Sequence, residues 1–120
     1  MLSIAFVVLA AASALGSTLA VLYLRGRTAP PAPLAATHEL FGIGGVCCLI
    51  LSLSGPPRGS ELGVASFGAM AALLIALAAF AGLGVLLMRR RGRRRTGALI
   101  ALHAMLAVSG FVLLAAYILV

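Results

Sequence analysis

The fold of this chain is decided by the stretch from residue 62 to residue 96, which reads LGVASFGAMAALLIALAAFAGLGVLLM and then RRRGRRRT. The part that ends at Met88 has no charged side chain, and it is longer than the about 20 apolar residues that a helix needs to cross a bilayer. In lipid a helix closes its own backbone hydrogen bonds, and arginine is typical of the boundary of such a span. The stretch therefore predicts a transmembrane helix followed by a polar connector.

The same alternation of apolar run and short connector extends over the whole chain. Of its 120 residues, 63% are hydrophobic and 9% charged, whereas a soluble domain has about 25% charged residues. The predicted spans cover residues 2–24, 34–54, 62–88 and 98–120. Because all connectors are short, consecutive helices must be antiparallel neighbours. We therefore expect one domain, residues 1–120, that is an all-α membrane protein with four transmembrane helices in an up-down-up-down bundle.

The positive charge of the chain indicates membrane topology. All nine basic residues are arginine, and they stand between the apolar runs without interleaved aromatic residues, which argues against nucleic-acid binding. The first and third connectors hold eight of them and the second holds one. The positive-inside rule then predicts cytoplasmic arginine-rich loops, with both termini on the outer, periplasmic face of an inner cell membrane. The lipid bilayer is the first partner that the sequence predicts.

Two histidines lie inside the predicted spans. Ionisable groups within a bilayer are costly and mark candidate functional sites. His38 is four residues into the second span and His103 is five residues into the fourth, so at ~1.5 Å per residue both lie roughly 6–8 Å below the arginine-rich boundary. These two helices are the diagonal pair of a simple bundle. We therefore expect the two imidazoles to face each other across its axis.

Two neutral imidazoles at equal depth are what one bis-histidine haem b requires as axial ligands. Each histidine is followed seven residues later by a glycine, Gly45 or Gly110, on nearly the same helix face, and Gly42 lies one turn beyond His38. Small residues of this kind give a porphyrin face room beside a helix. The predicted cofactor site therefore comprises His38 and His103 as ligands of the haem iron, with Gly45, Gly110 and Gly42 beside the macrocycle.

A weak internal repeat supports this arrangement. Aligning His38 with His103 also aligns Gly45 with Gly110, and Leu49 falls on Leu114. The repeat predicts two related helical hairpins about an axis along the membrane normal, each of which contributes one ligand.

With these residues the chain resembles the four-helix b-type cytochromes of membranes, such as haem-bearing anchors of respiratory dehydrogenases and small quinone-linked cytochromes b. The resemblance covers the second and fourth spans. It implies electron exchange between quinone and a membrane protein partner, as a subunit of a respiratory complex. It also implies that Arg25, Arg27 or Arg90 contacts the haem propionates or lipid. The chain departs from two-haem relatives because two histidines are enough for one haem only.

Other interpretations remain open. A transmembrane histidine can simply form a hydrogen bond between helices, in a haem-free accessory subunit of a larger membrane complex. A small transporter is a third class, but the first span lacks the ionisable residue that proton coupling would need. Connectors this short leave no room for a soluble active site, so we expect an electron-transfer or accessory subunit and not a complete enzyme.

Overall fold

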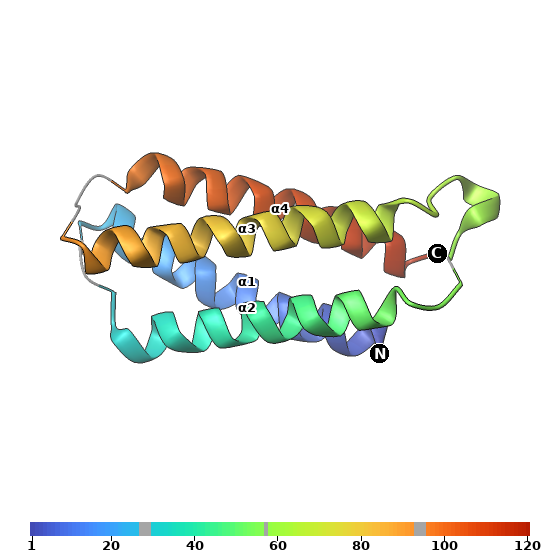
Figure 1. Cartoon of the computed structure of the whole chain (residues 1–120), viewed down its shortest axis with the longest axis horizontal. Helices are drawn as coiled ribbons and strands as arrows, with labels where there is room; N and C mark the ends of the chain where they lie inside the picture. The colour runs from blue at the N-terminus through green and yellow to red at the C-terminus, as the bar shows by residue number, and fades with distance from the viewer. Residues whose placement is uncertain (27–29, 57, 93–95) are drawn as a thin grey trace.

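The computed structural model describes residues 1–26, 30–56, 58–92 and 96–120, and these contain four long helices and one short 3-10 turn (Figure 1). The elements are α1 Leu2–Leu24, α2 Ala32–Ser52, η1 Ser60–Leu62, α3 Phe67–Arg90 and α4 Gly97–Ile118. All four helices are long and apolar enough to cross a membrane. The predicted all-helical, four-helix membrane fold is therefore confirmed.

The helix boundaries agree with the predicted spans to within about two residues, except at the start of α3. The prediction began that helix at residue 62, but α3 begins at Phe67. Gly59 and Gly63 have φ of 65° and 71°, and they flank the 3-10 turn Ser60–Leu62. A left-handed residue cannot continue a right-handed helix, so Gly63 separates the turn from α3. At α2, Pro33 lies in the first turn, where its missing N–H costs nothing, and the helix begins at Ala32.

The helices form two hairpins that pack side by side. α1 packs along α2 and α3 along α4, while contact between the hairpins, at α2 with α3 and α1 with α4, is less extensive. Figure 1 shows both chain ends and the α2–α3 connection at one end of the bundle. The bundle measures 49 × 23 × 22 Å. The ends of α1 and α3 and the starts of α2 and α4 meet at the other end, which we call the arginine end because Arg25 and Arg89–Arg91 lie there.

The tightly packed core lies in the half of the bundle that contains the chain ends. Phe6 of α1 stacks on Phe111 of α4 beside this core, with ring centroids 5.1 Å apart, and so joins the two hairpins. The buried residues of the core are Ala5, Leu9, Leu49, Ala71, Ile75 and Leu114. Many other large apolar side chains are exposed on the outside of the bundle, where a lipid bilayer is the favourable solvent.

The two hairpins bury equivalent residues. Leu49 of α2 and Leu114 of α4, which the repeat aligns, are both fully buried. Ala5 of α1 and Ala71 of α3 are also fully buried, one residue out of the alignment that pairs His38 with His103. The aligned glycines of the sequence repeat, Gly45 and Gly110, are also both buried. The internal repeat seen in the sequence is therefore matched by equivalent buried positions in the two hairpins.

Candidate functional site

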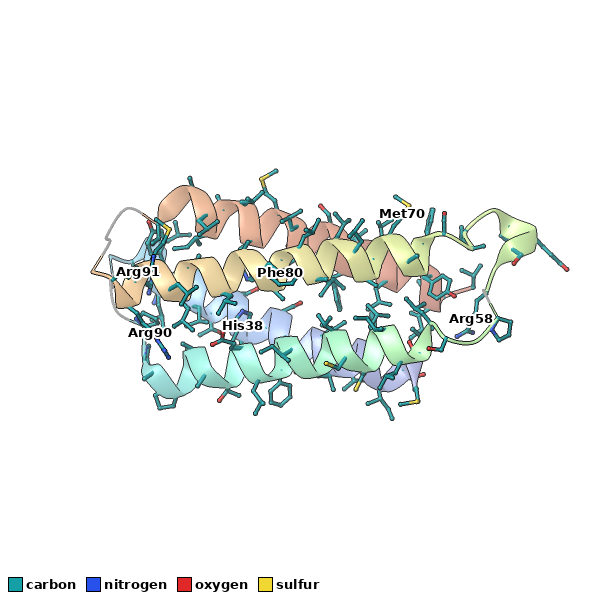
Figure 2. The ribbon with its side chains drawn as sticks, viewed as in Figure 1. His38, Arg58, Met70, Phe80, Arg90 and Arg91 are labelled. Carbon is teal, nitrogen blue, oxygen red and sulfur yellow. The ribbon has the colours of Figure 1, made fainter. Side chains whose placement is uncertain are left out.

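The structure brings the two histidines together. His38 lies six residues beyond the start of α2 and His103 six residues beyond the start of α4, which puts both about 9 Å along their helices from the arginine end. Their ring centroids are 5.9 Å apart and their planes are inclined by 83°. Figure 2 shows His38 on the side of α2 that faces the other helices. The two imidazoles are therefore neighbours across a diagonal of the bundle.

Each imidazole is anchored to a backbone carbonyl of its own hairpin. Nδ1 of His38 lies 2.9 Å from the carbonyl oxygen of Ala12 in α1, and Nδ1 of His103 lies 2.6 Å from that of Ala78 in α3. A carbonyl oxygen can only accept a hydrogen bond, so Nδ1 must be the donor in both cases. A neutral imidazole has one N–H, so with Nδ1 as the donor its Nε2 holds a lone pair.

A glycine of the partner helix lies against each ring. A Cβ atom at Gly16 of α1 would be 2.9 Å from Cε1 of His38, and one at Gly82 of α3 would be 3.1 Å from Cε1 of His103. The first distance is shorter than real Cβ contacts essentially ever are, and the second is tighter than most of them. The close approach of each ring to its partner helix thus depends on the absence of a side chain at Gly16 and Gly82.

The two Nε2 atoms make no hydrogen bond within the part of the chain that the structure describes. Both histidines are partly buried. The described residues also contain no cluster of three or more His, Cys, Asp or Glu side chains that could enclose a metal ion. What this site offers is therefore a pair of imidazole nitrogens with lone pairs, held on opposite hairpins.

The glycines that the sequence placed beside a cofactor have other neighbours in the structure. Gly45 is buried against Leu9 of α1, and Gly110 is buried against Ile75 of α3, so both lie at a close contact between the helices of one hairpin. Gly42 is partly buried and has open space where a Cβ atom would lie. Contact of these three glycines with a cofactor stays a prediction.

Two of the three arginines assigned to propionates or lipid lie at the expected end of the bundle. Arg25 and Arg90 are exposed there, and Figure 2 shows Arg90 and Arg91 at the end nearer His38. Arg27 lies outside the described residues. The exposed guanidinium groups suit anionic groups at a membrane surface.

The sequence did not reveal what orients the histidines. Ala12 and Ala78 accept the hydrogen bonds through their backbone oxygens. The pattern of side chains in a sequence does not indicate which backbone oxygens do so. The sequence did contain one signal for these positions. In the first span Gly16 follows Ala12 by four residues, and in the third span Gly82 follows Ala78 by four residues. Such spacing is typical of close helix contacts in membranes.

Comparisons with protein-family models, with curated proteins and with solved structures found no match for this chain. Its function is therefore inferred from the chemistry of the histidine pair and its surroundings.

Proposed function

We propose that this chain is a membrane electron-transfer protein that binds one haem b, with His38 and His103 as the axial ligands of the iron. The observation that carries the proposal is that both imidazoles donate from Nδ1 to a carbonyl, which leaves Nε2 to bind a metal. Histidines that ligate metals almost always donate their other ring N–H to such an acceptor, which fixes the tautomer and the ring orientation.

The distance between the ring centroids is compatible with two imidazoles that share one metal ion. Bonds between imidazole nitrogen and a transition metal are about 2 Å long, and the ring centre lies about 1 Å further on, so two opposed imidazoles have centres roughly 6 Å apart. The centroids of His38 and His103 are 5.9 Å apart. Two protein ligands are too few for a structural zinc site, which needs four. An iron porphyrin brings the remaining ligands itself.

The contacts between the helices also favour a group between the hairpins. No Cα atom of α2 lies within 8 Å of one in α4, and the same holds for α1 and α3, in the part of the chain that the structure describes. Helices within one hairpin are much more closely packed than helices of different hairpins. A macrocycle between the histidines would therefore lie between two hairpins that contact each other little. Gly16 and Gly82 have no side chains that would crowd the imidazole rings.

When bound, the haem would supply a one-electron carrier. His38 and His103 would hold its iron, and the carbonyls of Ala12 and Ala78 would keep both rings in the ligating tautomer. The apolar helices would exclude water from the site. Arg25 or Arg90, with Arg27, would pair with the propionates or with anionic lipid at the arginine end.

The proposed exchange of electrons runs between quinone and a membrane protein partner. The histidine pair is nearer the arginine end, which is the cytoplasmic end if the positive-inside rule holds for this chain. Electrons would therefore enter or leave on that side of an inner membrane. The chain would then act as an electron-transfer subunit, and its protein partner would carry out the catalytic reaction.

One spectrum tests the proposal. The full chain, produced in haem-replete cells and purified in mild detergent, should give a reduced-minus-oxidised spectrum of haem b at one haem per chain. His38→Ala and His103→Ala should each abolish it. Met105→Leu is the matched control, because Met105 lies on α4 near His103 but is 69% exposed on the outside of the bundle. A folded, colourless wild-type protein would refute haem binding.

A haem-free accessory subunit is the second candidate, and the same hydrogen bonds favour it. The bonds from His38 to Ala12 and from His103 to Ala78 join the two helices of each hairpin without any cofactor. Bonds of this kind between membrane helices contribute about 0.6 kcal/mol on average. This candidate predicts a colourless protein that is purified together with a larger membrane complex.

A further inference from the structure

The positions of Gly16 and Gly82 suggest a role beyond close packing. We propose that these two glycines are positioning residues, which uncover the carbonyls of Ala12 and Ala78 and so select the tautomer in which each histidine presents an unprotonated Nε2. The part of this inference that concerns haem rests on the proposed function. The part that concerns the tautomer does not, because the hydrogen bonds are formed without any ligand.

The geometry of an α-helix explains why a glycine is needed at this spacing. The carbonyl of Ala12 accepts the backbone N–H of Gly16, the residue four positions later. Side chains tilt toward the start of their helix, so the side chain of a residue covers the turn that precedes it. A glycine at position 16 leaves the carbonyl at position 12 open from the side, and the same relation links Gly82 to Ala78. Each carbonyl can then accept a second hydrogen bond, from an imidazole.

The distances show how little room there is. A Cβ atom at Gly16 would lie 3.3 Å from Nδ1 of His38, and one at Gly82 would lie 3.1 Å from Nδ1 of His103. With the contacts to Cε1, a methyl group at either place would push the ring away from its carbonyl. The hydrogen bonds of 2.9 and 2.6 Å would then be lengthened or broken. Alanine at either position therefore requires the imidazole ring to move.

Loss of this hydrogen bond changes what the imidazole can bind. A ring without an acceptor at Nδ1 is free to keep its proton on Nε2, and that nitrogen then has no lone pair for a metal. The acceptor also raises the basicity of the ligating nitrogen, and removal of such a partner typically lowers metal affinity about 10–100-fold. A more basic ligand stabilises oxidised iron, so a lost acceptor should raise the midpoint potential of a bound haem.

The test uses the full chain without haem, with ¹⁵N-labelled histidine, in lipid bicelles. Imidazole nitrogen chemical shifts distinguish the two neutral tautomers. The wild type should show both histidines protonated on Nδ1. Gly16→Ala should move the proton of His38 and leave His103 unchanged, while Gly82→Ala should do the reverse. The unaffected histidine reports that the bundle is still folded.

Two glycines serve as controls. Gly44 on α2 has open space where an added methyl group would lie, with no atom within 4 Å, so Gly44→Ala should change neither histidine. Gly68 on α3 lies at the far end of the bundle, where a Cβ would be 2.8 Å from the ring of Tyr117. Gly68→Ala thus introduces a comparable clash away from the site and should also leave both tautomers unchanged. The proposal is overturned if Gly16→Ala and Gly82→Ala keep the Nδ1 proton, or if each variant alters both histidines equally.

A second measurement separates this inference from the proposed function. With haem, Gly16→Ala and Gly82→Ala should bind it about 10–100-fold more weakly than the wild type and with a raised midpoint potential. Equal affinity and potential in all three proteins would overturn the positioning role toward haem. If the wild type binds no haem but the tautomers respond as described, haem binding fails and the role of the glycines stands.

Discussion

Truncation of the two fully buried leucines measures how this bundle is held together. Leu49 and Leu114 have no exposed surface, and they occupy equivalent positions in the two hairpins. Leu→Ala removes three carbon atoms, for which transfer from water contributes about 0.8 kcal/mol each, or roughly 2.4 kcal/mol. In soluble cores the same change costs about 4 kcal/mol, because a cavity term adds to the transfer term.

In a bilayer only the cavity term should remain. The separated helices keep their leucines in lipid, which is as apolar as the core, so the transfer term is absent. We therefore expect Leu49→Ala and Leu114→Ala each to cost about 1.5 kcal/mol, or roughly a tenfold change in the unfolding equilibrium. Equilibrium unfolding in bicelles by added SDS measures this cost. Leu40→Ala and Leu102→Ala are the controls, since these leucines are 70% and 49% exposed and should cost little.

Three outcomes would contradict this reasoning. Costs near 4 kcal/mol would mean that the unfolded state exposes these residues to water, as in a soluble core. Equal costs for buried and exposed leucines would mean that the core lies elsewhere. A large cost at Leu114 with none at Leu49 would mean that the two hairpins do not contribute equivalent halves of the core.

Two further predictions concern the joint between the hairpins and the orientation in the membrane. Phe6→Leu and Phe111→Leu, combined in a double-mutant cycle in the same unfolding assay, should show a coupling of about 0.5–1.5 kcal/mol for the stacked pair; additive effects would contradict a direct contact. A reporter enzyme that is active only in the periplasm, fused after Val120, should be active, and replacing Arg89–Arg91 with glutamine should reduce that activity because the positive charge at the connector is lowered. Activity of a cytoplasmic reporter in its place would refute the proposed orientation.

Much of the fold could be predicted from hydropathy, because each helix is an apolar run and the first three runs are followed by connectors rich in glycine, proline or arginine. The exception is the segment before Phe67, where Leu62, Val64 and Ala65 look like the start of a span. Hydropathy cannot distinguish such residues in a turn from the same residues in a helix. The backbone conformation of Gly63 makes the difference, and a glycine in a sequence does not show the sign of its φ.

The site could be predicted only in part. The depth of His38 and His103 and their place on diagonal helices follow from counting along the spans, and the structure brings the two rings together. The hydrogen-bond acceptors of the two histidines are backbone oxygens, and the residue types in the sequence do not identify them. Gly45 and Gly110 lie on nearly the same faces as the histidines, and these faces are turned toward the partner helix of each hairpin. In the structure the two glycines therefore allow the helices of each hairpin to pack closely.

The pairing of the histidines favours a ligand over simple helix packing. One histidine bonded to one carbonyl would be enough to join the helices of a hairpin, and any apolar side chain could fill the space beyond it. Here both hairpins place a partly buried imidazole at the same depth, and its Nε2 has no hydrogen-bond partner among the described residues. An unpaired polar group is costly in a membrane interior. A single ligand that takes both nitrogens at once would remove that cost from both hairpins and join them, and the proposed haem iron is such a ligand.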